Sequence, residues 1–146
     1  MKENKTELEQ NIDEIIEKAR KTSNTFILET AKLIKAELLS NKHSEKPIPE
    51  LEVLQKMSKE RAKTIDVYNK AGRIDLRDKE AKELGFIQEF IPKEPSEQEI
   101  EELIAELMEA TTLTIKDTKD VIADVQDRFP TAQKGTIVRI FKSLLQ

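Results

Sequence analysis

Cysteine and tryptophan are absent from this sequence of 146 residues, and glycine occurs only three times. The lack of cysteine excludes disulfides, thiolate catalysis and metal binding through sulfur. Aromatic residues make up only 4%, so a hydrophobic core must be built mostly from leucine, isoleucine, valine and alanine. With 37% charged residues and so few glycines, the composition favours amphipathic helices over sheets.

Long apolar runs are also missing. No stretch approaches the roughly 20 apolar residues that a helix needs to cross a bilayer. The first residues, M-K-E-N-K-T-E, lack the hydrophobic segment of a signal peptide. A reducing compartment is also consistent with a chain that has no cysteine. We therefore expect a cytoplasmic protein that makes no contact with a membrane.

The charged residues are unevenly distributed, although the net charge is only −4. Residues 1–91 carry 18 basic and 18 acidic side chains, whereas residues 92–146 carry 7 basic and 11 acidic ones. Six of these acids lie between Glu97 and Glu109, and none follows Asp127. The molecule as a whole is therefore no obvious nucleic-acid binder, but its last predicted helix is locally basic.

Apolar residues recur at helical spacing in seven segments, and neither strand alternation of useful length nor an internal repeat is found. The segments cover approximately residues 8–19, 27–38, 49–72, 75–92, 96–111, 115–129 and 137–145. We predict an all-α, multihelical fold of about seven helices in two subdomains. Residues 1–91 are expected to form an N-terminal helical array, residues 92–95 a linker, and residues 96–146 a C-terminal three-helix bundle.

Local stop and start signals separate several of these helices. Gly72 directly follows the third helix, where a left-handed backbone angle is expected. Asp75 is a predicted N-cap of the fourth helix, which should run as far as Pro92 because proline cannot continue a helix. Ser96 and Glu99 have the S-x-x-E spacing of a capping box, which predicts the start of the fifth helix.

Catalytic and metal-binding candidates are few. His43 is the only histidine and lies in a polar loop, so we expect a solvated residue rather than a general base. Glu99, Glu102 and Glu106 share a helical face, but a di-iron site would also need a Glu-x-x-His pair. The sequence has neither a phosphate-binding glycine loop nor a nucleophile elbow. We therefore expect no cofactor and no metal, and an isolated chain that is not catalytic.

Four lysines lie near one face of the third predicted helix: Lys56, Lys59, Lys63 and Lys70. This face is either a solvated helix surface or a set of phosphate contacts for a nucleic acid. Because aromatic residues are not interleaved with the lysines, an RNA partner should be bound as a folded shape through its backbone.

Two arginines of the same region have open alternatives. Arg61 lies on the otherwise apolar side of the third helix, so it either extends its charge to solvent or pairs with an acid on another helix. Arg73 either hydrogen-bonds the carbonyl groups that end the third helix or contacts a partner.

The stretch from Thr64 to Ile100 contains an A-G-R-x-D-L junction, the Lys79–Glu80 pair, an aromatic-apolar-Pro ending and an S-x-x-E-I restart. These motifs resemble the YqeY family, and Thr30–Leu39 (T-A-K-L-I-K-A-E-L-L) resembles its second-helix segment. That family is related to the tail of GatB, the B subunit of the tRNA-dependent amidotransferase, where a helical appendage helps to hold the tRNA.

The resemblance implies a tail-like module associated with tRNA or with a tRNA-amidation complex. By the same relationship the family is linked to carbon–nitrogen ligase activity with glutamine as amido-nitrogen donor, for which these residues give no independent chemical support. The candidate RNA-binding residues are Lys56, Lys59, Lys63, Arg73, Lys134, Arg139 and Lys142.

The C-terminal segments depart from the family pattern. Residues 117–122 read D-T-K-D-V-I, where family members have a D-M-G-K-V-M-like start, and residues 131–135 (T-A-Q-K-G) replace a glycine-rich turn. The turn therefore has fewer glycines to let its backbone approach a phosphate. The alternative function is a helical protein-interaction adaptor without RNA binding, whose contact face would be Glu101, Glu102 and Glu106.

Overall fold

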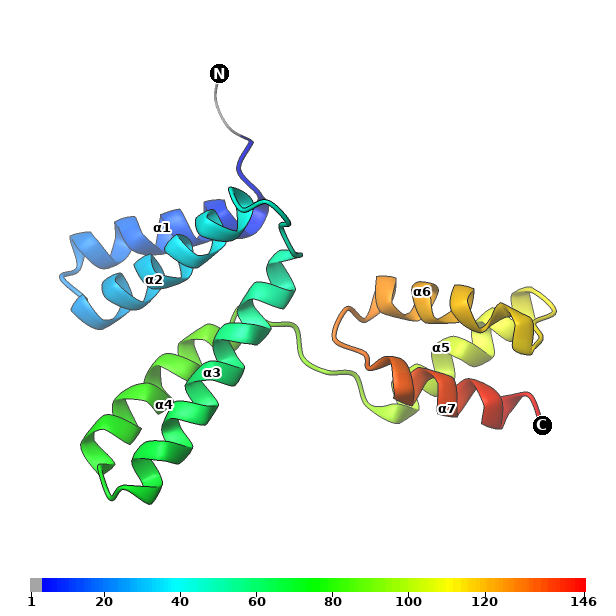
Figure 1. Cartoon of the computed structure of the whole chain (residues 1–146). Coiled ribbons are helices and arrows are strands. Elements are labelled where there is room, and N and C mark those ends of the chain that lie inside the picture. The colour runs from blue at the N-terminus through cyan, green and yellow to red at the C-terminus, as the bar shows by residue number, and fades with distance from the viewer. Residues whose placement is uncertain (1–3) are drawn as a thin grey trace. The chain divides into compact units, whose positions relative to one another are not determined.

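A computed structural model describes residues 4–146. All regular secondary structure in these residues is helical (Figure 1). In chain order the α-helices are α1 (Glu7–Lys21), α2 (Thr25–Lys42), α3 (Glu50–Lys70), α4 (Ile74–Gln88), α5 (Glu97–Ala110), α6 (Thr118–Arg128) and α7 (Lys134–Leu144), with a short 3₁₀ helix η1 (Ile115–Asp117) before α6. No strand occurs among the described residues. The all-α prediction with seven helices is therefore confirmed. The chain divides into two compact units, Met1–Ile91 and Pro92–Gln146.

The N-terminal unit consists of two helical hairpins, with α1 beside α2 and α3 beside α4 (Figure 1). Helices α1, α2 and α3 bury apolar residues at helical spacing, as the sequence pattern predicts, whereas α4 buries Phe86 and Ile87 near its end. The buried core residues of this unit are Ile12, Ile16, Ala31, Ile34, Leu38, Val53, Leu54, Met57, Phe86 and Ile87. Phe86 also packs edge-on against Phe26 and Phe90, with ring centroids 6.4 and 5.3 Å apart.

The turn between α1 and α2 contains a residue with an unfavourable backbone angle. Ser23 has a φ of +56°, the only positive value for a non-glycine residue in the described chain. Its amide donates to Arg20 O at 3.3 Å, and the amide of Asn24 donates to Ala19 O at 2.9 Å. This pair of bonds is a Schellman motif, which usually places glycine at the position held by Ser23. Asn24 then caps α2 by accepting from the amide of Ile27 at 3.2 Å.

The turn between α3 and α4 uses the same motif with glycine in place. Gly72 has a φ of +72°, its amide donates to Asn69 O at 3.2 Å, and the amide of Arg73 donates to Tyr68 O at 2.9 Å. The predicted left-handed angle at Gly72 is therefore confirmed. The predicted N-cap at Asp75 is wrong, because α4 begins two residues after the Schellman glycine, with Arg73 as N-cap. Asp75 lies in the first turn instead, where a carboxylate is favoured by the helix dipole.

The end of α4 also differs from the expectation that this helix runs to Pro92. It ends at Gln88, and the amides of Glu89, Phe90 and Ile91 each donate to the carbonyl three residues earlier, at 3.1–3.2 Å. Such bonds tighten the last turn relative to an α-helix. Phe90, in this tightened turn, packs edge-on against Phe86.

Asp13 of α1 is the centre of an ion-pair cluster. Asp13 accepts from Lys5 Nζ and from Lys35 Nζ, both at 2.7 Å. The hydrogen bond from Lys35, followed by the bond from Lys5, holds the pKa of the Asp13 carboxyl below its ordinary value. Asp13 therefore links the segment before α1 to the middle of α2.

The C-terminal unit is a three-helix bundle formed by α5, α6 and α7. The predicted capping box is present: Ser96 Oγ accepts from the amide of Glu99 at 3.1 Å, and Glu99 Oε1 accepts from the amide of Ser96 at 3.2 Å. The buried residues of this unit are Ile100, Ile104, Val121, Val125, Ala132, Ile137, Ile140 and Phe141. Phe141 is the largest of its fully buried side chains, so the small core is organised around one aromatic ring.

Candidate nucleic-acid interface

A row of lysines follows the solvent-facing side of α3. Lys56, Lys59 and Lys63 are exposed, and their ammonium groups make no ion pair with any residue between 4 and 146. We call these three residues the lysine row. Lys70 is one more exposed lysine of this helix, but it pairs with Asp66 at 3.0 Å. The lysine row therefore carries three ammonium groups that are not held in ion pairs with the described residues, whereas the ammonium group of Lys70 is paired.

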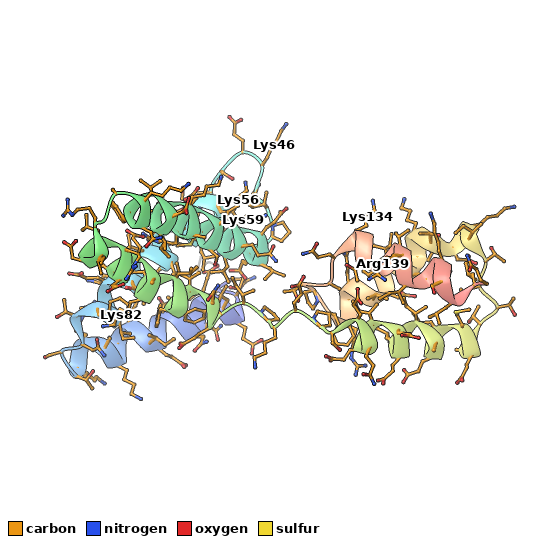
Figure 2. The ribbon with its side chains drawn as sticks, turned by 90° about the horizontal axis from the view of Figure 1, so that it is seen from below. Lys46, Lys56, Lys59, Lys82, Lys134 and Arg139 are labelled. Atoms are coloured by element: carbon orange, nitrogen blue, oxygen red, sulfur yellow. The ribbon has the colours of Figure 1, made fainter. Side chains whose placement is uncertain are left out.

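The loop after α2 adds a fourth lysine that the sequence alone did not indicate. Lys46 is exposed, and Figure 2 places it on the same edge of the N-terminal unit as Lys56 and Lys59, while Lys82 lies at the opposite edge. The loop is held by Asn41, whose side chain donates to Ile48 O at 2.7 Å and accepts from the Ile48 amide at 2.9 Å. The asparagine at the end of α2 was the only local signal for this fixed loop.

Arg61 stabilises the α3–α4 hairpin rather than facing a partner. Its guanidinium pairs with Glu80 at 3.0 Å and with Glu83 at 2.9 Å, both on α4. All three side chains are largely withdrawn from solvent, and Glu83 is buried. Of the two alternatives for Arg61, pairing with acids on another helix is therefore the observed one. The charged hydrogen bonds compensate for the cost of burying the two carboxylates.

Arg73 lies at the turn between α3 and α4. Its side chain pairs with Asp75 rather than with the carbonyl groups that end α3, which was one of the two alternatives. Its guanidinium contacts Asp75 Oδ1 and Oδ2 at 3.4 Å each. The hydrogen bond from Arg73 is the main cause that lowers the pKa of the Asp75 carboxyl. Both side chains are exposed, so this pair can exchange for a contact with another anion at little cost.

The three C-terminal candidates occupy α7 but have different surroundings. Lys134 is the first residue of the helix and Lys142 lies in its last turn, and both are exposed. Arg139 pairs with Glu97 of α5, so its charge is compensated. Figure 2 shows Lys134 and Arg139 on this helix of the C-terminal unit.

The turn before α7 is fixed by contacts with the residues that precede α5. Thr131 Oγ1 donates to Lys93 O at 3.1 Å, and Gln133 Nε2 donates to Glu94 Oε1 at 3.0 Å. Gly135 lies within α7 and does not have a positive φ. The single glycine that remains in this turn therefore does not give the backbone the left-handed freedom that a phosphate loop would use.

The opposite charge gathers on α5. This helix carries six glutamates and no basic residue. A surface groove beside it is lined by Glu99, Glu102, Leu103, Glu106, Arg128 and Phe129. Two of the six glutamates have partners within the unit, since Glu97 pairs with Arg139 and Glu102 accepts from Gln98 at 3.2 Å. The C-terminal unit thus presents an acidic helix and a short basic helix within one bundle.

The single histidine and the acidic side chains were the remaining candidates for catalysis or metal binding. His43 is an exposed residue at the C-terminal end of α2, where its amide donates to Leu39 O at 3.1 Å. In the part of the chain from residue 4 onwards, no group of three or more His, Asp or Glu side chains is placed to hold a metal ion. Within the same part, none of the helices is both long enough and apolar enough to pass through a bilayer.

These features define a class of protein: an all-helical chain of two units, whose N-terminal unit carries a row of exposed lysines outside any ion pair among residues 4–146. The model of the family of YqeY-like proteins matches residues 5–145. The chain therefore belongs to the YqeY family, and the family resemblance of residues 64–100 is confirmed. Comparison with curated proteins finds no match.

Proposed function

We propose that this chain is a tRNA-associated accessory module that binds folded RNA through its N-terminal unit. The observation that carries the proposal is the basic surface formed by the lysine row and Lys46, whose four ammonium groups have no acidic partner among residues 4–146. Lysines that are not held in ion pairs are free to release counterions from a nucleic-acid backbone. The relationship of the family to the tRNA-holding tail of GatB supports tRNA as the RNA.

The arrangement of the lysines favours backbone contact over base stacking. Lys56 and Lys63 are separated by about 10 Å along the helix axis, given a rise of 1.5 Å per residue. No aromatic side chain lies between them in the sequence of α3. A rigid helix with evenly spaced ammonium groups suits the phosphates of a folded RNA, whose shape rather than sequence is recognised.

A filter-binding titration with total tRNA tests this function. At low salt we expect measurable affinity, and log affinity should fall with log salt with a slope of about −3, as expected for three to four phosphate contacts. A chain that shows no tRNA affinity even at low salt contradicts the proposal.

We further propose that any ligase chemistry linked to the family resides in another polypeptide. The chain contains no cysteine and a single histidine, so it lacks a thiol nucleophile and has no histidine pair. The module would then contribute binding, and the transfer of an amide group from glutamine would need a separate catalytic subunit.

A helical adaptor without RNA binding is the second candidate. The six glutamates of α5, among them Glu101, Glu102 and Glu106, favour a basic protein segment as its partner. The two candidates differ in the surface they use: an adaptor would lose its partner when α5 glutamates are replaced, and would not respond to changes in the lysine row.

A further inference from the structure

A surface groove lies between α2 and α3, directly beside the lysine row. Its floor contains the apolar residues Ile48, Val53 and Met57, of which Val53 and Met57 are buried, and the polar residues Ser40, Asn41 and Ser44 also line the groove. Ile48 is fixed by its two hydrogen bonds with Asn41. The groove is therefore a preformed feature of the N-terminal unit and does not depend on a flexible loop.

Two carboxylates and one ammonium group border this floor. Glu37 projects from α2, and Glu60 and Lys56 project from α3. Glu37 and Glu60 are exposed, and their carboxylates have neither a hydrogen bond nor an ion pair with the residues from 4 to 146. Lys56, in the same groove, also remains without an acidic partner. Acceptors of this kind, held beside an apolar floor, are suited to a ligand that brings its own N–H donors.

We infer that this groove is a subsite for an unpaired guanine base of the RNA, with the phosphates next to that base contacting Lys56, Lys59 and Lys46. The inference rests on the proposed function and names the base that the same surface would select. Guanine has two adjacent donors on its Watson–Crick edge, N1–H and the N2 amino group. One carboxylate can accept both in a bidentate pair, whereas adenine, cytosine and uracil each offer a single donor group on that edge.

In this proposal the floor of the groove contacts the face of the base, and the charged side chains around the floor contact the edge of the base and the RNA backbone. Val53 and Met57 present aliphatic and thioether surface to the face of the base. A base that has left the RNA stack needs such a contact to replace its stacking neighbours. Glu37 and Glu60 read its edge. The lysine row holds the backbone, which fixes the position of the base without carrying sequence information.

A basic peptide is the competing occupant, since it could also satisfy the two glutamates. Lys56 lines the groove, and Lys59 and Lys46 lie along the same edge of the unit (Figure 2). These ammonium groups would repel a lysine-rich or arginine-rich segment and attract a phosphate. A site with ammonium groups beside unpaired carboxylates therefore favours a ligand that carries both phosphates and N–H donors, as a nucleotide does and a basic peptide does not.

The test uses the full chain and two synthetic RNA hairpins, read by fluorescence anisotropy at low salt. One hairpin has a loop of uridines with a single guanosine, and the other has inosine in its place, which removes only the N2 amino group. The variant is the double substitution Glu37→Gln and Glu60→Gln. Glu52→Gln is the matched control, because Glu52 is an exposed glutamate of α3 that does not line the groove.

The wild-type chain should bind the guanosine hairpin about tenfold more tightly than the inosine hairpin, the effect of one charged hydrogen bond. The double variant should lose that preference and bind the guanosine hairpin more weakly, although it carries two fewer negative charges. On a surface that attracts RNA only by charge, the same variant would bind both hairpins more tightly. Glu52→Gln should keep the preference.

Three results would overturn the inference. The first is equal wild-type affinity for both hairpins, together with tighter binding of both by the double variant. In that case, affinity of the wild-type chain for tRNA would still support the proposed function. The second is binding of a lysine–leucine peptide that the double variant abolishes, which would assign the groove to a protein partner. The third is the absence of any RNA affinity, total tRNA included, which removes the proposed function as well. Unchanged thermal melting of each variant, followed by circular dichroism, confirms that the fold is intact.

Discussion

Gly72 and Ser23 occupy equivalent positions in two helical hairpins, yet only one of them is glycine. Both have a left-handed backbone angle, with φ of +72° and +56°, and both lie in a Schellman motif. A residue with a Cβ atom is disfavoured there by about 1–2 kcal/mol. The comparison of these two turns leads to opposite predictions for substitution.

Replacement of Gly72 by valine should lower the free energy of unfolding by about 1–2 kcal/mol or more, because a β-branched residue resists this conformation. Urea denaturation measures the effect. Gly85 is the control: it lies in α4 without a positive φ, and an added Cβ would meet no atom within 4 Å. Gly85→Ala should therefore stabilise the chain by about 1 kcal/mol. Equal effects of the two substitutions would contradict the role of the backbone angle at Gly72.

Replacement of Ser23 by glycine should stabilise the chain by about 0.5–1 kcal/mol, since relief of the left-handed angle exceeds the added entropy of the unfolded chain. Thermal melting checks this prediction. Thr22→Gly is the neighbouring control, because Thr22 has a φ of −92° and its hydroxyl donates to Lys18 O at 3.0 Å. A loss of stability in the Ser23 variant as large as that in the Thr22 variant would sink the prediction.

Asp13 should make the stability of the N-terminal unit depend on pH. Its folded pKa lies below the ordinary value because Lys35 and Lys5 donate to the carboxylate. A group with a lowered folded pKa stabilises the fold above its unfolded pKa of about 4 and loses that contribution as the pH falls through the folded pKa. The difference in unfolding free energy between wild type and Asp13→Asn should therefore be constant above about pH 5 and shrink toward about pH 2. A difference that grows on acidification would be incompatible with this ion pair.

At the scale of single elements, α3 has two functions on two faces. One face is fixed by Arg61 and its two glutamates on α4, and the other carries the lysine row. The structural face tolerates little change, because removal of Arg61 would leave buried Glu83 without its partner. The exposed face can be altered without loss of the fold, so it is the correct place to test RNA binding.

Replacement of Lys59 and Lys63 by glutamate should weaken binding of all tRNAs alike and reduce the slope of log affinity against log salt by about two. Filter binding at several salt concentrations measures both quantities. Lys18→Glu with Lys79→Glu is the matched control, since these exposed residues of α1 and α4 lie outside the lysine row and give the same change in net charge. If the control pair weakens binding as much, the net charge of the molecule rather than the lysine row determines affinity.

At the scale of the whole molecule, the chain combines a neutral N-terminal unit with an acidic C-terminal one, and the lysine row lies on the former. This distribution favours local recognition over general attraction to nucleic acid. Departure of residues 131–135 from the family pattern, together with the pairing of Arg139 and Glu97, reduces what α7 can contribute. We therefore place most of the proposed RNA contact on the N-terminal unit.

The isolated protein should release no ammonia from glutamine above background. A glutaminase needs an activated nucleophile, and this chain has no cysteine and only one histidine. A coupled ammonia assay with purified protein checks the prediction. Release that disappears after a single point substitution in the chain would overturn it.

The sequence by itself determined the features that depend on local chain energetics. The helical stripes, the capping box at Ser96 and the left-handed turn at Gly72 each follow from the preferences of a few neighbouring residues. The lysine row followed in the same way, because helical periodicity alone places Lys56, Lys59 and Lys63 on one side of α3.

Ion pairs and neighbours that involve residues far apart in the chain became visible only in the tertiary structure. The partners of Arg61 lie about twenty residues away on a second helix. The edge with Lys56 and Lys59 also receives Lys46 from the loop after α2, and Arg139 pairs with Glu97, 42 residues earlier in the chain. Periodicity carries no information about such pairings, since they depend on how helices pack and not on the order of residues within each helix.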